Sequence, residues 1–102
     1  MSAVKPILGI IGGGQLGSML ASAAKKINIK TVVISDDEAA PAKNFCDKFI
    51  YAKYNNEDKI DEFVQASNIV TFEFENIPYE TLKKISQKRP VFPDPSINKI
   101  IQ

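Results

Sequence analysis

The sequence predicts a doubly wound α/β fold, in which a parallel sheet of four to five strands carries helices on both faces. Short apolar, β-branched runs typical of buried strands alternate with segments whose apolar residues recur at three- and four-residue spacing, as in amphipathic helices. A glycine-rich turn joins the first such run to the first helical segment. Strands that alternate with helices imply right-handed crossovers, which make neighbouring strands parallel. With 102 residues, 44% of them hydrophobic, the chain can build one core.

The first half of the chain supplies three expected strands. Residues 7–11 are apolar apart from Gly9, which is typical of a strand buried on both faces. Residues 31–34 are β-branched throughout and predict the second strand, and residues 49–54 predict the third. Pro41 favours the first turn of a short helix between them. The helix after the first strand is expected to bury one apolar face, made of Leu16, Met19, Leu20, Ala23, Ala24 and Ile27.

The second half continues the alternation. Asn55 or Asn56 can cap a helix whose buried stripe includes Phe63. Residues 69–74 predict the fourth strand, after which Pro78 opens another helix. Residues 91–92 are expected to form a short fifth strand. In such a sheet, ligands bind beyond the carboxyl ends of the strands where the strand order reverses, so the loops after the first and fourth strands are the expected site.

The composition excludes several classes of function. Thirteen Lys and Arg against twelve Asp and Glu give a net charge of +1, so no strong field attracts nucleic acid or a membrane surface. Histidine is absent, which excludes Ser-His-Asp and Cys-His catalysis and a histidine-ligated metal within these residues. The single cysteine, Cys46, allows no intrachain disulfide and fits a reducing compartment. No apolar stretch approaches a signal peptide or the roughly 20 residues of a membrane span, so we expect a cytoplasmic location. From the absent histidine and the single cysteine, we expect no catalytic or metal-binding residue in this chain.

Residues 12–17, with the sequence GGGQLG, fit the pattern G-x-G-x-x-G between a strand and a helix. Gly12 permits the tight turn, Gly14 lets the backbone approach a phosphate, and Gly17 lets helix and strand pack closely. The free amides at the helix start make an anion site. Three interpretations stay open: a turn that serves packing alone, a simple phosphate site, or the NAD(P)-binding site of an oxidoreductase or regulatory subunit, for which Asp36 would hold the ribose. A module that serves only subunit contacts is a fourth, non-enzymatic interpretation.

Residues 71–76 alternate, so that Thr71, Glu73 and Glu75 share one face of the fourth strand. A buried carboxylate costs several kcal/mol unless it is paired or hydrogen-bonded, so packing alone is a poor explanation for Glu73. We expect Glu73 to lie where the strand emerges into the ligand crevice and to accept hydrogen bonds from an amine or hydroxyls. The alternative is an edge strand with one solvated face.

The chain resembles the 5-(carboxyamino)imidazole ribonucleotide synthases, which are ATP-grasp enzymes of bacterial and fungal purine synthesis. The resemblance is carried by GIIGGGQLG at residues 9–17 and TFEFENI at residues 71–77, together with Pro41, residues 52–54 and residues 93–95. It implies a Rossmann-like pre-ATP-grasp domain at residues 1–94, with residues 95–102 beginning the connection to an ATP-grasp domain that this chain lacks.

The resemblance also implies an activity and a site. The family's enzymes are ligases that use ATP, magnesium and bicarbonate to carboxylate 5-aminoimidazole ribonucleotide, and a homodimer is expected. Gln15 and Leu16, with the backbone of Gly14 and Gly17, would lie near the ribose phosphate, and Glu73 would contact the ribose or the amine. ATP and magnesium would bind outside this chain, which alone would be inactive.

Two positions depart from the family pattern. Ser18 stands where the family usually has a basic residue, and Ser35-Asp36 stands where the second strand tends to end in Asp-Pro. The loop after the second strand is therefore expected to differ, and no role is carried over to Asp36.

Overall fold

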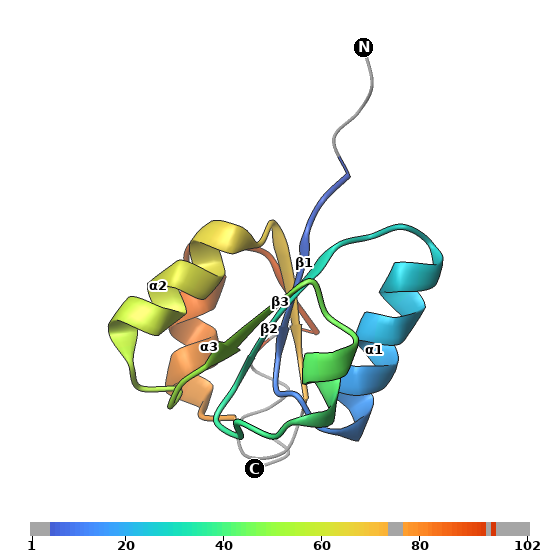
Figure 1. The fold of residues 1–102 in the computed structure, drawn as a ribbon. Coiled ribbons are helices and arrows are strands. Elements are labelled where there is room, and N and C mark those ends of the chain that lie inside the picture. The colour runs from blue at the N-terminus through green and yellow to red at the C-terminus, as the bar shows by residue number, and fades with distance from the viewer. Residues whose placement is uncertain (1–4, 74–76, 94, 96–102) are drawn as a thin grey trace.

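The computed structural model describes residues 5–73, 77–93 and 95, which form a five-stranded parallel sheet with helices on both sides (Figure 1). The strand order is β3-β2-β1-β4-β5 and every neighbouring pair is parallel. The order reverses between β1 and β4, which lie side by side in the middle of the sheet. The elements in chain order are β1 (Leu8–Ile11), α1 (Gln15–Lys26), β2 (Thr31–Ser35), the 3-10 helix η1 (Pro41–Asn44), β3 (Lys48–Tyr51), α2 (Glu57–Ala66), β4 (Ile69–Phe72), α3 (Tyr79–Ser86) and β5 (Val91–Phe92).

The helices divide between the two faces of the sheet, which confirms the doubly wound prediction. α1 and η1 cover one face, and α2 and α3 cover the other (Figure 1). The larger core lies on the side of α2 and α3, where Phe63, Leu82 and Ile85 pack against strand residues such as Ile11 and Phe72. The smaller core, on the side of α1, is made of Ile10, Ala21, Val33 and Ala42.

The predicted buried face of α1 is wrong in most of its members. The buried residues of this helix are Gly17, Ala21 and Ala24, whereas Met19 is 60% and Ile27 is 62% exposed. The cause is the close approach of α1 to the strand that precedes it: a Cβ atom on Gly17 would lie 2.3 Å from the carbonyl oxygen of Gly12. Because small residues must occupy this contact, the large apolar side chains turn away from the sheet. Leu16, predicted to be buried, is 42% exposed for the same reason.

Several boundaries differ from the predicted ones. β3 spans Lys48–Tyr51, shorter than predicted, because the chain turns after Ala52, whose amide still bonds to the Ser35 carbonyl. β4 ends at Phe72, and Phe74 lies outside the described residues, as do Glu75 and the element expected to begin at Asp94. The α2 cap is Asn56, whose side chain accepts a hydrogen bond from the Lys59 amide at 3.1 Å.

Candidate functional site at the glycine loop

The candidate site lies where β1 and β4 end side by side. The glycine loop follows β1, and Glu73 follows β4 directly, so the reversal of strand order brings residues 56 positions apart together. They enclose a cavity of about 160 Å³ that is open to solvent. Its lining residues are Gly12, Gly13, Gly14, Ser35, Asp36, Asp37, Ala40, Tyr54, Glu73 and Ile77.

The backbone of the glycine loop is fixed from two sides. Gly12 has a φ of +101°, a conformation that side-chain-bearing residues rarely adopt, and its amide donates to the Ile34 carbonyl at 2.8 Å. The Gly13 carbonyl accepts from the Ala42 amide at 3.0 Å. The loop is therefore held at the end of β2 and at η1, and Gly14 is the N-terminal cap residue of α1 without a side chain to bond the helix amides.

The Glu73 side chain accepts a hydrogen bond from a first-turn amide of α1, which the cap residue Gly14 has no side chain to do. Its Oε1 accepts a hydrogen bond from the Gly17 amide at 2.9 Å, and its own amide donates to the Ile11 carbonyl at 3.0 Å. A Cβ atom on Gly12 would lie 2.8 Å from Oε2 of the same carboxylate, so a side chain at this position would displace the Glu73 carboxylate. The carboxylate thus sits at the positive end of the α1 dipole, where an anion is favoured. This explains how a half-buried glutamate is accommodated there.

The other predicted contact residues surround this pair unevenly. Gly17 is buried and Gly14 is half-buried, whereas Gln15 and Leu16 lie exposed on the first turn of α1. The first amides of a helix have no partner within the helix, so those of Gln15 and Leu16 remain available to a ligand. Ser18, also on this turn, is half-buried.

The charge of the cavity is negative. Asp36, Asp37 and Glu73 line it, and no lysine or arginine belongs to its described lining. Within the described lining, positive potential comes from backbone amides and the α1 N-terminus. The hydrogen-bonding side chains other than these carboxylates are Ser35 and Tyr54; the Ser35 hydroxyl already accepts from the Asp37 amide at 3.1 Å.

Tyr54 is a lining residue that was not among the predicted site residues. It is 8% exposed, and burial, with the nearby Asp36 carboxylate as a second cause, raises the pKa of its phenol to about 12. Only its position just after the third strand, at the carboxyl edge of the sheet, could have indicated a site. The composition of residues 49–54 predicted an ordinary strand instead.

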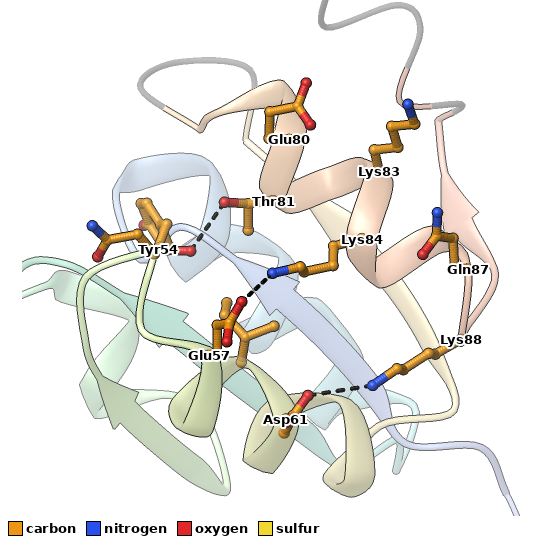
Figure 2. A pocket seen from close by; sticks show the side chains of 11 residues that line it. Tyr54, Glu57, Asp61, Glu80, Thr81, Lys83, Lys84, Gln87 and Lys88 are labelled. Atoms are coloured by element: carbon orange, nitrogen blue, oxygen red, sulfur yellow. Dashed lines mark hydrogen bonds and ion pairs between the residues drawn. The ribbon is translucent and has the colours of Figure 1, made fainter.

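A larger groove of about 740 Å³ runs between α2 and α3 (Figure 2). Two ion pairs cross it, Lys84 with Glu57 and Lys88 with Asp61, and all four side chains are more than half exposed. Lys84 lowers the pKa of Glu57, mainly through their hydrogen bond. Exposed pairs of this kind contribute little to stability. The groove is therefore a solvent-exposed surface of mixed charge.

The described residues were also compared with the requirements of a metal site and of a membrane-spanning helix. Among the described residues, no group of three or more Cys, Asp or Glu side chains is arranged to hold a metal ion. Within the same part of the chain, none of the helices combines the length and the apolar character needed to cross a membrane.

The fold and this loop define a class of domain, the Rossmann-like domain that precedes an ATP-grasp fold. The family model described as "Ribonucleotide synthetase preATP-grasp domain" matches residues 5–102, and the chain belongs to this family. Among curated proteins, it is similar to the N5-carboxyaminoimidazole ribonucleotide synthase of Staphylococcus epidermidis, with 44% identity over 80 residues. The alignment covers 78% of this chain and 21% of that protein, so the chain spans about a fifth of the relative's length.

Solved structures agree with this. The N5-carboxyaminoimidazole synthetase of Staphylococcus aureus, complexed with ADP, superposes with a TM-score of 0.89 and 35% identity, covering 100% of this chain and 28% of that one. The N5-carboxyaminoimidazole ribonucleotide synthetase of Thermotoga maritima gives a TM-score of 0.83 and 35% identity over 95% of this chain and 27% of that one. The resemblance predicted from the two motifs is confirmed.

Proposed function

We propose that this chain is the N-terminal domain of a 5-(carboxyamino)imidazole ribonucleotide synthase and that its glycine-loop cavity forms part of the ribonucleotide site. The observation that carries the proposal is the pairing of Glu73 with the Gly17 amide at 2.9 Å across the point where the strand order reverses. Family membership supports the same conclusion.

The proposed substrate contacts are the backbone of Gly14 and Gly17, together with Gln15, Leu16 and Glu73. The exposed first-turn amides suit the ribose phosphate, because amides at a helix start bind anions. Glu73 suits the ribose hydroxyls or the amine, because a carboxylate accepts hydrogen bonds from such donors. Since Oε1 is engaged with Gly17, the carboxylate is already oriented and Oε2 is left to meet the ligand.

The rest of the reaction belongs to residues outside this chain. The complete enzyme would bind ATP and magnesium in its ATP-grasp domains, activate bicarbonate, carboxylate the exocyclic amine of 5-aminoimidazole ribonucleotide and release ADP and phosphate. We also propose that it is a cytoplasmic homodimer and that the domain boundary falls near residues 94–95. Because the activation of bicarbonate is assigned to the ATP-grasp domains, the chain by itself is expected to release no ADP.

An NAD(P)-binding domain is the competing proposal, and the size of the cavity argues against it. At about 160 Å³ it is smaller than the roughly 300–1,000 Å³ of typical sites for whole small molecules, and it suits a phosphoribosyl group better than a dinucleotide. A titration of this chain with NADH, followed by nicotinamide fluorescence, separates the two: tight binding would favour the dinucleotide site.

The direct test is Glu73→Gln in the complete synthase. Glutamine keeps the shape of the side chain but removes a charge-assisted hydrogen bond of about 1.5–3 kcal/mol, so the KM for the ribonucleotide should rise about tenfold or more while the KM for ATP stays nearly constant. Glu80→Gln is the matched control, because Glu80 is exposed on α3 and lines the other groove. Unchanged kinetics in Glu73→Gln would refute the assignment.

A further inference from the structure

The phenol of Tyr54 is a buried hydrogen-bond donor at the wall of the cavity. Tyr54 is 8% exposed, and it lines the cavity together with the glycine loop and Glu73. Its backbone carbonyl accepts a hydrogen bond from the Thr81 hydroxyl at 3.0 Å, which ties the segment after β3 to α3 (Figure 2). The ring belongs to the larger core. The side chain is thus held at its ring and at its backbone, and its hydroxyl lies near Ser35 and Asp36 of the same cavity.

The phenolic oxygen lies beside the Ser35 side chain and the Asp36 backbone, which line the same cavity. The Asp36 and Glu73 carboxylates are near enough to disfavour its ionisation. The phenol therefore stays neutral at physiological pH. A neutral phenol at the cavity wall can donate a hydrogen bond to a bound ligand oxygen.

This donor has a particular value in this cavity. The three carboxylates that line it repel the oxygens of a phosphoribosyl group, and the described lining holds no lysine or arginine to offset them. The Ser35 hydroxyl accepts from the Asp37 amide at 3.1 Å, and Tyr54 is the other hydroxyl-bearing residue of the described lining that can donate to such an oxygen.

We propose that Tyr54 is a substrate-positioning residue whose hydroxyl donates a hydrogen bond to an oxygen of the phosphoribosyl group bound at the glycine loop. This proposal rests on the proposed function, because it assigns one more contact in the same site. It makes the wall opposite the glycine loop, formed by the segment after β3, part of the ribonucleotide site.

The test is Tyr54→Phe in the complete synthase, which removes the hydroxyl and keeps the ring packed in the core. A neutral hydrogen bond contributes about 0.5–1.5 kcal/mol, so the KM for 5-aminoimidazole ribonucleotide should rise about 2- to 10-fold. The KM for ATP, kcat and the thermal midpoint without ligand should stay as in the wild type. Tyr51→Phe is the matched control: Tyr51 lies three positions earlier, is 55% exposed and does not line the cavity, so all these quantities should be unchanged.

The outcomes separate this inference from the function on which it rests. If Glu73→Gln raises the KM for the ribonucleotide but Tyr54→Phe does not, the role of Tyr54 is refuted and the proposed function stands. If Tyr54→Phe raises the KM for ATP as well as the KM for 5-aminoimidazole ribonucleotide, the residue is structural and the inference fails. A lower thermal midpoint without ligand has the same meaning. If the complete wild-type synthase releases no ADP in response to 5-aminoimidazole ribonucleotide, both proposals fail.

Discussion

Replacing Gly17 with alanine tests the close contact that sets the position of α1. A Cβ atom at this position would lie 2.3 Å from the carbonyl oxygen of Gly12, well inside van der Waals contact, and 3.3 Å from Oε1 of Glu73. The Gly12 carbonyl cannot simply yield, because Gly12 has a φ of +101° and its amide is bonded to Ile34. The helix must therefore move away from β1, which strains the Glu73 contact.

The expected cost follows from two opposing terms. Overpacking typically costs 1–3 kcal/mol of stability. Because the clash here is with rigid backbone, we take its cost as about 3 kcal/mol, the upper end of this range. Alanine regains about 1 kcal/mol over glycine in a helix, which leaves a net loss of about 2 kcal/mol. For a domain of this size, that lowers the thermal midpoint by roughly 8–16 °C.

The assay is urea unfolding of the 102-residue chain, followed by circular dichroism, with the free energy of unfolding taken by linear extrapolation. Ser22→Ala is the matched control, since Ser22 is a half-buried residue of the same helix without a hydrogen bond from its side chain among those found in the described residues. It should cause little change. A Gly17→Ala variant as stable as the wild type would show that the contact does not hold α1 in place.

Two further predictions concern other parts of the fold. Asn56→Ala removes the side-chain acceptor for the Lys59 amide and should lower the free energy of unfolding by about 1 kcal/mol in the same urea assay; Asn55→Ala, exposed beside it, is the control, and equal effects would contradict the cap. Tyr54 has its pKa raised from 10.0 to about 12 by burial, so the folded state favours the neutral phenol, and this stabilisation is fully present below pH 10 and lost as the pH rises through 12. The wild type should therefore lose stability relative to Tyr54→Phe between pH 10 and pH 12, and a constant difference in unfolding free energy would mean that the phenol is not buried.

Local patterns in the sequence were sufficient for the architecture. Alternation of apolar runs with helical periodicity predicted five strands and the helices between them, because burial of both sheet faces requires these patterns. The Gly12–Gly17 pattern indicated the turn for a similar reason, since few residues other than glycine adopt the backbone that the turn requires. Pro78 was predicted to open a helix, and it is the N-terminal cap of α3, which begins at Tyr79.

The orientation of α1 could not be read from its own residues. Its large apolar side chains form a stripe that predicts a buried face, and Met19 and Ile27 are nevertheless exposed. What decides the orientation is the distance between α1 and the Gly12 carbonyl, which only a side chain as small as that of Gly17 can tolerate. A contact between two backbones leaves no periodic signal in hydrophobicity.

The sequence by itself determined the fold class and the glycine loop and marked Glu73 as a candidate contact residue, because each depends on residue types in local order. The tertiary structure decided that the Glu73 carboxylate binds the Gly17 amide and that Tyr54 lines the same cavity. Both relations join residues from separate strand ends, and they exist only because the parallel sheet gathers its carboxyl ends at one edge. No local pattern records which side chains meet there, since that depends on strand order and register.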